Sequence, residues 1–335
     1  MNKSSKKIVS IIPVSPFEPL SVIKKSIGSL KNMEKPEEYE TEFHYVVDTE
    51  DIENDERVNF LENLNDEEVK YMIREPGEGK RAGAINDLLE AIDTPKYVGL
   101  FDVDSRPSSN FLVTSLENFP EDVFMVTSTR EIINPDQNFI THMVDAEYRF
   151  LSDVQILLDQ NSGFNHFNGL IGLLDGRFLM NNKLDTEKMC EDTDFSTRAY
   201  MNGKRIHVNR KSSVKEQAVT NFEDLYSQKE RWMNAPWENL EEFVGPMLSS
   251  KTDPKIKLSW ISAMILPLFS ALFSFFSPLY GLRMLLSKEK TNKVLEKVVG
   301  LFAISWLISY CYVVAGFKRA TGGEVKWTAS EREDV

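Results

Sequence analysis

Hydrophobic and polar positions follow two alternating patterns along residues 1–245. Short apolar runs, typical of buried strands, are separated by longer stretches in which apolar residues recur every three or four positions, as on one face of a helix. The runs predict strands at 8–13, 43–48, 69–74, 97–102, 123–128, 170–174 and 205–208, and the longer stretches predict helices at 20–33, 81–92, 139–158 and 193–201. Strands that alternate with helices predict an α/β fold with a mainly parallel sheet flanked by helices.

Two strongly apolar stretches follow this part of the chain. Residues 258–282 contain no charged side chain in 25 positions, and residues 298–317 contain none in 20. Because a helix rises about 1.5 Å per residue, each stretch is long enough to cross the ~30 Å hydrocarbon core of a bilayer. We therefore predict a membrane segment over residues 246–320, between a domain of residues 1–245 and a polar tail of residues 321–335.

The topology of the membrane segment stays open at this stage. Pro267 and Pro278 allow the first stretch either to cross once, with a kink, or to dip in and return as two half-length pieces. Lysine and arginine are equally numerous in the connecting loop and in the flanks, so they predict no orientation. A buried pair of helices in a soluble protein is the remaining alternative.

Charge and cysteine content narrow the function classes. Lys and Arg number 39 against 52 Asp and Glu, a net charge of −13, which disfavours a nucleic-acid partner. Cys190 and Cys311 stand alone, with no second cysteine or histidine at the spacing of zinc ligands. The sequence therefore predicts neither a disulfide framework nor a zinc site.

Two carboxylates follow the predicted strand 97–102. If the strand continued through Asp102, Val103 and Asp104, its alternation would place both carboxylates on one side, at the edge where ligands of such sheets sit. Two hard oxygen donors suit Mg²⁺ or Mn²⁺ bound together with a diphosphate. A solvated turn is the alternative interpretation of this pair.

A second pair of carboxylates, Glu191 and Asp192, precedes an amphipathic helix. A carboxylate at a helix N-terminus is stabilised there, so Asp192 or Asp194 could be an ordinary N-cap. Beside a metal-bound diphosphate, a carboxylate could instead take the proton from an attacking hydroxyl as a general base.

A third group, Gln228, Arg231 and Trp232, falls on one face of a predicted helix near residues 221–240. The guanidinium could hold phosphate oxygens and the indole could border a sugar ring. The same helix could also rest on the membrane surface, and the two interpretations are compatible.

The segment from Gly77 to Asn86 loosely fits the G-x-G-x-x-A pattern of dinucleotide-binding folds, with Asp102 lying 20 residues beyond Ala82. A Rossmann-type NAD(P)-dependent oxidoreductase is therefore an alternative function. That alternative leaves Asp104, Glu191 and the Gln228–Trp232 group unexplained.

Taken in order, these motifs resemble those of family 2 glycosyltransferases, the membrane-associated inverting enzymes that include cellulose, chitin and hyaluronan synthases. The resemblance is carried by Ile11-Ile12-Pro13-Val14-Ser15, Val46-Val47-Asp48, Lys80–Asn86, Asp102-Val103-Asp104, Phe167-Asn168-Gly169, Glu191-Asp192 and Gln228-x-x-Arg231-Trp232. It implies a GT-A fold, a nucleotide-sugar donor and C-terminal membrane helices. Cys190 and Leu170-Ile171 depart from the residues common in relatives, which affects the acceptor pocket but not the predicted base.

The resemblance also implies roles for individual residues. The donor nucleotide would be bound by Pro13, Ser15, Asp48, Lys80, Asp102 and Gln228. A Mg²⁺ or Mn²⁺ ion would sit on Asp102 and Asp104. The catalytic residues would be Asp192 as the base, Glu191, and Arg231, which would steady the departing diphosphate. The acceptor would be lined by Phe167, Asn168, Gly169 and Trp232.

The predicted protein is thus an enzyme anchored in a membrane with its catalytic domain on the cytoplasmic side. It would move a sugar from a nucleotide diphosphate sugar, with UDP as the favoured nucleotide, to a lipid-linked or saccharide acceptor. Two apolar segments are too few to build a secretion channel in a monomer, which favours the transfer of one or a few sugars. A processive polysaccharide synthase and a non-catalytic scaffold remain as alternatives.

Overall fold

The computed structural model describes residues 6–75, 79–117, 119–167, 169–286 and 291–323. The chain divides into two compact units. Within the described residues, the first unit takes 6–129 and 166–215, and the second takes Arg130–Asn165 and 216–323.

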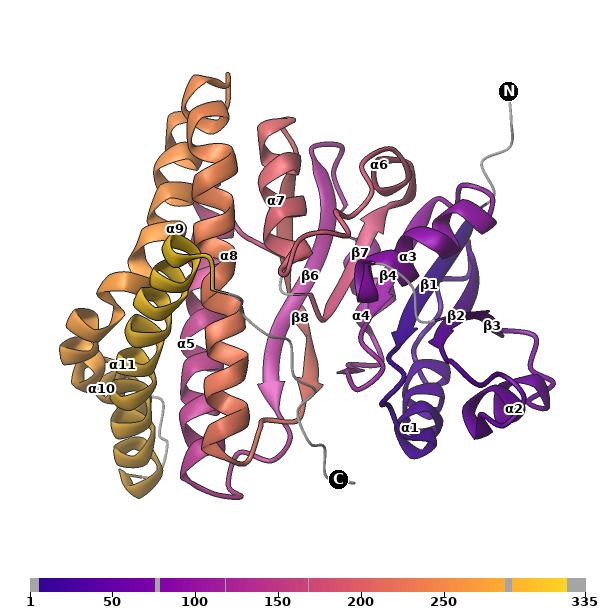
Figure 1. Ribbon diagram of the computed structural model, residues 1–335, viewed down its shortest axis with the longest axis horizontal. Coiled ribbons are helices and arrows are strands. Elements are labelled where there is room, and N and C mark those ends of the chain that lie inside the picture. Colours follow the sequence, from indigo (N-terminus) through magenta and orange to yellow (C-terminus); the bar gives the residue numbers. More distant parts are fainter. Residues whose placement is uncertain (1–5, 76–78, 118, 168, 287–290, 324–335) are drawn as a thin grey trace. The chain divides into compact units, whose positions relative to one another are not determined.

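The first unit is built on a sheet whose strand order is β3-β2-β1-β4-β7-β6-β8-β5 (Figure 1). The strands are β1 Lys7–Val14, β2 Glu40–Asp48, β3 Val69–Arg74, β4 Tyr97–Phe101, β5 Arg106–Pro107, β6 Val123–Ile132, β7 Ile171–Asp175 and β8 Arg205–Glu216. β1 pairs in parallel with β2 and with β4, and β2 pairs in parallel with β3. β7 is antiparallel to β4 and β6, and β5 is antiparallel to β8. The sheet is therefore mixed, with its parallel half at β3-β2-β1-β4.

Every predicted strand is present, with small differences at the ends. The largest difference is at β8, which runs to Glu216 and not to Val208. Its extension, Asn209–Glu216, is rich in polar residues that hide the apolar alternation of a strand, and part of it pairs with the two-residue strand β5. The strand predicted at 97–102 ends at Phe101, one residue before the first carboxylate.

The helices of the first unit are α1 Leu20–Lys31, α2 Glu56–Glu62, α3 Lys80–Ala91, α4 Phe111–Leu116, α6 Gly176–Asn181 and α7 Glu191–Met201. α1 buries Ile23, Ile27 and Leu30 in a core shared with Ile8 and Ile12 of β1. Because β1 lies inside the sheet and is almost entirely buried, its sequence is a nearly continuous apolar run. The short helices α2, α4 and α6 have too few turns to show a helical period in the sequence.

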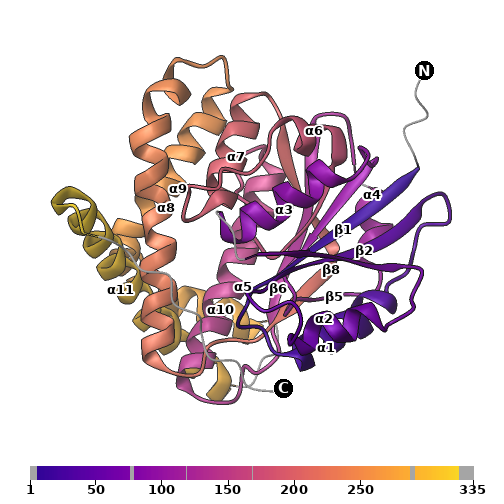
Figure 2. The same cartoon turned by 45° about the vertical axis from the view of Figure 1, so that its right-hand side comes forward.

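The second unit contains the longest helices: α5 Phe139–Gln160, α8 Phe222–Ser249, α9 Pro254–Phe273, the 3₁₀ turn η1 Ser274–Phe276, α10 Ser277–Leu286 and α11 Thr291–Thr321. α11 packs against α5, α8, α9 and α10 (Figure 2). Their shared core includes Met143 and Val144 of α5, Leu225 of α8, and Leu301 and Ile304 of α11.

The runs Pro254–Leu286 and Lys293–Thr321 are long and apolar enough to cross a membrane. The first run is interrupted at Ser274–Phe276, between α9 and α10. Pro267 lies inside α9, and Pro278 lies in the first turn of α10, where proline leaves no helical hydrogen bond unmade.

Candidate active site

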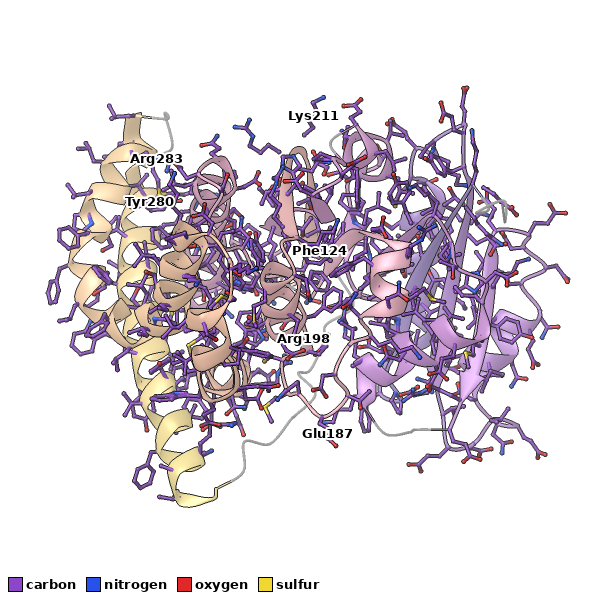
Figure 3. The ribbon with its side chains drawn as sticks, turned by 90° about the horizontal axis from the view of Figure 1, so that it is seen from above. Phe124, Glu187, Arg198, Lys211, Tyr280 and Arg283 are labelled. Atoms are coloured by element: carbon purple, nitrogen blue, oxygen red, sulfur yellow. The ribbon has the colours of Figure 1, made fainter. Side chains whose placement is uncertain are left out.

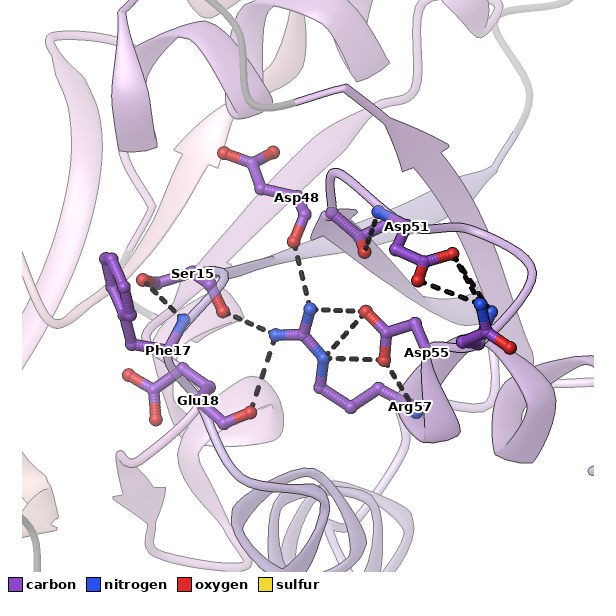
Figure 4. A network of polar contacts seen from close by, with 9 residues as sticks. Ser15, Phe17, Glu18, Asp48, Asp51, Asp55 and Arg57 are labelled. Atoms are coloured by element: carbon purple, nitrogen blue, oxygen red, sulfur yellow. Dashed lines mark hydrogen bonds and ion pairs between the residues drawn. The ribbon is translucent and has the colours of Figure 1, made fainter.

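The ends of β1 and β2 are held together by a buried arginine, Arg57 of α2 (Figure 4). Its Nη1 donates to the carbonyl of Ser15 at 2.7 Å, and its Nη2 donates to the carbonyl of Asp48 at 3.1 Å. Its Nε donates at 2.9 Å to Asp55, whose side chain also caps α2. One rigid guanidinium with five donors can fix both strand ends at once. Sequence reasoning missed Arg57 because its contact with Ser15 spans 42 positions of the chain.

The side chain of Asp48 is held by a second arginine. Arg74, at the end of β3, places its Nε 2.6 Å from Asp48 Oδ1 and its Nη1 2.5 Å from Asp87 Oδ2 on α3. Burial raises the pKa of the Asp48 carboxyl above its ordinary value, although Arg74 opposes that shift. The predicted nucleoside-binding carboxylate is therefore kept in one orientation at the carboxyl edge of the parallel strands.

Asp102 and Asp104 lie in a turn that follows β4. The backbone N–H and the hydroxyl of Ser105 both donate to the carbonyl of Asp102, at 2.9 and 2.7 Å. The strand therefore does not continue through the pair, and a turn presents the two half-buried carboxylates. The N–H of Asp102 donates to the carbonyl of Leu170 at 3.0 Å, which ties this turn to the segment before β7.

Arg81, in the first turn of α3, joins three of the predicted motifs. Its Nε donates to Asp102 Oδ1 at 2.9 Å, its Nη1 donates to Glu191 Oε1 at 2.7 Å, and its Nη2 donates to the carbonyl of Gly169. Its guanidinium carbon also lies 5.9 Å from the centre of the Phe167 ring. The sequence analysis selected the neighbouring Lys80 as a donor-binding residue but did not select Arg81 itself.

The partners of Arg81 keep its guanidinium protonated. Burial alone would lower the pKa of this guanidinium, but the carboxylates of Asp102 and Glu191 raise it above its ordinary value. The cation therefore stays charged and holds two carboxylates that would otherwise repel each other.

The start of α7 places Asp192 beside the backbone of Gly169. A Cβ added to Gly169, whose φ is +79°, would lie 3.1 Å from Asp192 Oδ2. The hydroxyl of Ser196 donates to the Asp192 carbonyl and accepts from the Phe167 N–H, both at 2.7 Å. Cys190 occupies the N-cap position, so Asp192 is not the cap. Asn168 lies outside the described residues.

Lys80 opens α3 with a left-handed backbone. Its φ is +45°, and the preceding Gly79 has a φ of +84°. A Cβ at Gly79 would come within 2.6 Å of the Thr186 side chain, so both conformation and space require glycine there. Such strain in a lysine persists where the surroundings enforce it, and it is common at ligand sites. Lys80 itself is exposed.

In the second unit, α8 carries the Gln228–Trp232 group around a buried lysine. Lys229 is fully buried and places its Nζ 2.6 Å from Glu147 Oε2 on α5. The same Nζ lies 4.1 Å from the centre of the Trp232 ring, which stacks on Tyr148 with 6.3 Å between ring centres. Burial lowers the pKa of Lys229, with Glu147 opposing the shift.

The side chains of Gln228 and Arg231 on α8 differ in their surroundings. Within the described residues, the Oε1 atom of Gln228 is buried and has no hydrogen-bond partner. Arg231 is half-buried. A buried acceptor without a donor is costly in a folded protein, so Gln228 fits a site that a ligand completes.

The predicted ligands for a cation are Asp102 and Asp104. In the part of the chain that the structure describes, no group of three or more histidine, cysteine, aspartate or glutamate side chains could hold a metal ion. Two carboxylates are nevertheless the usual protein share for Mg²⁺ when substrate phosphates and water complete its octahedron. The residues therefore fit a cation that arrives with a diphosphate, and not a resident structural metal.

Residues 17–235 match the family described as "Glycosyltransferase like family 2", and the chain belongs to that family. This membership confirms the resemblance carried by the ordered motifs. It favours glycosyl transfer over the dinucleotide-dependent oxidoreductase alternative.

Curated relatives include two plant enzymes. Glucomannan 4-beta-mannosyltransferase 2 of Arabidopsis thaliana is 24% identical over 264 residues, covering 74% of this chain and 48% of its own. Glucomannan 4-beta-mannosyltransferase 1 of Cyamopsis tetragonoloba is 21% identical over 271 residues, covering 77% of this chain and 50% of its own. The chain thus spans about half the length of these relatives.

Solved structures share the fold. The mannosyltransferase PcManGT from Pyrobaculum calidifontis, in complex with GDP-Man and Mn²⁺, has a TM-score of 0.66 at 14% identity and covers 95% of this chain and 88% of its own. Residues 1–349 of S. aureus TarS, in complex with UDP-GlcNAc, have a TM-score of 0.50 at 16% identity; the match covers 95% of this chain and 92% of the TarS chain. The predicted GT-A fold, an α/β fold followed by two apolar helices, is therefore confirmed.

Within the first unit, the structure brings together Phe167, Gly169, Asp102 and Glu191 around Arg81, and it places Asp192 beside Gly169. It places Pro13 within β1 and Ser15 and Asp48 at the ends of β1 and β2. Gln228, Arg231 and Trp232 share α8 in the second unit, as predicted.

Proposed function

We propose that this protein is a membrane-associated, inverting glycosyltransferase that uses a nucleotide diphosphate sugar. The observation that carries the proposal is the contact of Arg81 with Asp102, Glu191 and Gly169, because it joins three motifs far apart in the sequence into one charged site beside Asp192. In this proposal residues 1–245 form the catalytic domain, 246–320 the membrane segment and 321–335 a polar tail.

The donor would lie along the carboxyl edge of the parallel strands. Pro13, Ser15 and Asp48 would contact the nucleoside, and Lys80 and Gln228 would contact the diphosphate side of the donor. Arg57 and Arg74 support this assignment because they fix Ser15 and Asp48. A UDP-sugar is the favoured donor, and GDP-mannose is the second candidate, supported by the names of the plant relatives and by the GDP-Man bound to PcManGT.

Asp102 and Asp104 would hold a Mg²⁺ or Mn²⁺ ion together with the donor diphosphate. A bound cation of this kind supplies neutralising charge for the leaving group. Mn²⁺ in the PcManGT complex supports the choice of a divalent cation. Arg81, which already holds Asp102, would orient that carboxylate toward the diphosphate.

Asp192 would act as the general base. It would accept the proton from the acceptor hydroxyl while the hydroxyl oxygen forms a bond to the anomeric carbon and the bond from that carbon to the diphosphate oxygen breaks. The electron pair leaves with the nucleoside diphosphate, and the single displacement inverts the anomeric centre. Glu191 would keep Arg81 in place, and Arg231 would steady the departing diphosphate.

The acceptor would meet Phe167, Asn168, Gly169 and Trp232. A saccharide is supported by the names of the plant relatives, and a lipid-linked saccharide is supported by the two apolar helices. These helices also support attachment to a membrane, with the catalytic domain on the cytoplasmic side, where nucleotide sugars would be available. The alternative of processive polysaccharide synthesis is favoured by the glucomannan-forming relatives, which are about twice as long as the matched part.

An Asp192→Asn substitution tests the proposed mechanism. The amide cannot take up the acceptor proton, so we expect turnover to fall by at least about 100-fold. Membranes that contain the protein would be given labelled GDP-mannose and a panel of labelled UDP-sugars with Mn²⁺, and label in lipid and in long polymer would be counted separately. Donor binding, measured by thermal shift, should stay within a few-fold of the unaltered protein.

The matched control is Glu187→Gln, the same loss of charge at an exposed position a few residues earlier. It should retain full turnover. Unchanged turnover in Asp192→Asn would remove Asp192 as the base, and no transfer from any donor by the unaltered protein would overturn the proposed activity.

A further inference from the structure

The three C-terminal helices α9, α10 and α11 expose large apolar side chains along their whole length. On α11 these are Leu295, Val299, Phe302, Trp306, Tyr310, Val313 and Phe317, each more than a third exposed. Their spacing of three or four residues puts them in one stripe along one face of the helix. Soluble proteins rarely leave such a continuous apolar surface uncovered.

The opposite face of α11 lies on α5 and α8 from one end to the other. Near its start, Lys297 pairs with Asp145 of α5 at 3.3 Å, and Lys293 pairs at 2.6 Å with Asp136, just before α5. A Cβ on Gly300 would lie 3.1 Å from the Met143 backbone, which shows how closely α11 approaches α5 there.

Toward its other end α11 contacts α8 in the same way. The Trp237 indole donates to the carbonyl of Tyr312 at 2.9 Å. Lys318 pairs with Glu230 at 2.6 Å, and Arg319 pairs with Glu241. From Lys293 to Arg319 the helix is about 40 Å long at ~1.5 Å per residue, so these contacts occupy more than the thickness of a hydrocarbon core.

This packing decides how α11 can meet a membrane. If its apolar part crossed the bilayer, α5 and α8 would have to enter the hydrocarbon beside it. Those helices expose charged residues, among them Arg149, Glu223, Glu241 and Glu242. Charged side chains at the centre of a bilayer are strongly unfavourable. α11 and the α5–α8 pair can both avoid that cost only if α11 lies parallel to the membrane surface.

The exposed side chains on α9, η1 and α10 point to lipid and not to a protein partner. Phe269, Leu272, Phe273, Phe275 and Phe276 are all exposed, and their spacing puts them on one broad side of the helical run. The Phe275 ring packs against Phe302 of the α11 stripe, with 5.6 Å between ring centres, so the two exposed surfaces are continuous and one fluid monolayer can cover both.

Tyr280 and Arg283 lie together on α10 (Figure 3), where both side chains contact Asp153 of α5. Trp306 and Tyr310 lie in the α11 stripe. Aromatic and cationic side chains of this kind are typical of the boundary between headgroups and acyl chains.

From these contacts we infer that α9, α10 and α11 bind one leaflet of a lipid bilayer while lying flat on it, and do not cross it. The stripe of α11 and the exposed side chains of α9 and α10 enter the acyl region, and α5 and α8 stay on the aqueous side. This inference rests on the proposed membrane association and replaces two crossings with an in-plane attachment.

Depth measurements along the α11 stripe test the inference. Val299→Cys, Trp306→Cys and Val313→Cys would each carry a nitroxide, in the full chain bound to phosphatidylethanolamine–phosphatidylglycerol vesicles. Neighbouring labels lie seven residues, or about 10 Å, apart along the helix axis. Cys190 and Cys311 are buried, so background labelling should be low. Collision with oxygen and with a water-soluble nickel chelate gives the depth of each label.

A flat helix should give the three labels equal depths, about 5–10 Å below the headgroups. A crossing helix should place the Trp306 label deepest, with the other two about 10 Å shallower, and that profile would overturn the inference. If the nickel chelate reached all three labels freely, the helix would not be in lipid and the inference would be overturned. The inference would also be overturned if neither nickel nor oxygen reached the labels and the protein were a dimer, because a second copy would then cover the stripe.

Two controls make the outcome specific. Lys211→Cys, at an exposed position on β8, should stay fully accessible to nickel. Sugar transfer is measured in the same vesicles, so equal depths without transfer would contradict the proposed function and leave the flat attachment standing.

Discussion

At the scale of single residues, three arginines organise the first unit although none carries a proposed chemical step. Arg57 fixes the ends of β1 and β2, Arg74 fixes Asp48, and Arg81 joins Asp102, Glu191 and Gly169. Each guanidinium meets two or more partners from separate segments of the chain. Such contacts order a site before a ligand arrives, which lowers the entropy lost on binding.

An Arg57→Met substitution should weaken donor binding more than turnover. It leaves the carbonyls of Ser15 and Asp48 without their donor and Asp55 without its ion pair. We expect KM for the nucleotide sugar to rise by about tenfold, kcat to change little, and stability to fall by roughly 1–3 kcal/mol. Steady-state kinetics and chemical unfolding measure the three quantities.

The control for Arg57 is Arg205→Met, which removes an exposed ion pair with Asp122. Exposed pairs of this kind contribute about 0–1 kcal/mol, so the control should behave like the unaltered protein. A loss of kcat without a change in KM for Arg57→Met would contradict its positioning role.

An Asp104→Ala substitution should weaken binding of the donor only when a divalent cation is present. Loss of one carboxylate ligand should lower the Mn²⁺-dependent part of the affinity by about tenfold or more. Binding is measured by titration calorimetry with and without Mn²⁺. Asp93→Ala, at an exposed position before β4, serves as the control. Full metal-dependent binding in Asp104→Ala would remove this residue from the metal site.

At the scale of secondary-structure elements, α5 and α8 are locked together by buried charges. Lys229 of α8 pairs with Glu147 of α5, and the guanidinium carbon of Arg130 lies 4.0 Å from the ring centre of Tyr148 on α5 and 5.5 Å from that of Trp232 on α8. Because α8 also carries Gln228, Arg231 and Trp232, the Lys229–Glu147 pair sets the register at which α8 presents that group to its surroundings.

A Lys229→Met substitution should destabilise the protein strongly. It leaves the Glu147 carboxylate buried without its partner, which costs about 3–5 kcal/mol. The double variant Lys229→Met with Glu147→Gln should be clearly more stable than the single one, since the unpaired charge is gone. Chemical denaturation of both single variants and the double variant measures this coupling. If the loss of unfolding free energy in the double variant equalled the sum of the losses in the two single variants, the coupling would be contradicted.

At the scale of the whole molecule, the C-terminal helices are part of the folded core of the second unit. Leu301 and Ile304 of α11 are buried with Met143, Val144 and Leu225 of α5 and α8. These helices therefore complete a hydrophobic core in addition to supplying an apolar outer surface. The proposed membrane attachment and the folding of the second unit therefore depend on the same segment.

A chain that ends after Asp253 should consequently not yield a well-folded catalytic fragment. Loss of α9, α10 and α11 uncovers the apolar faces of α5 and α8, and exposed patches of that size cause association. We expect aggregation in size-exclusion chromatography and a lower Tm, compared with the detergent-solubilised full chain. A monomeric fragment with an unchanged Tm would show that the second unit folds without them.

By itself, the sequence determined the parts that depend on local patterns. Apolar runs located every one of the seven predicted strands, helical periods located α1, α3, α5 and α7, and the ordered motifs identified the family. The same patterns found the two long apolar stretches. Strand direction is absent from such patterns, so the antiparallel β7 was not predicted.

Only the tertiary structure decided which distant residues meet. Arg81 contacts Glu191, 110 positions away in the sequence, and Lys229 contacts Glu147, 82 positions away. A pattern of neighbouring residues therefore cannot predict either contact. The same holds for α11. Its composition is that of a membrane span, but its long contact with the charged helices α5 and α8 favours a helix that lies on the bilayer, because apolar length alone does not state what covers each face.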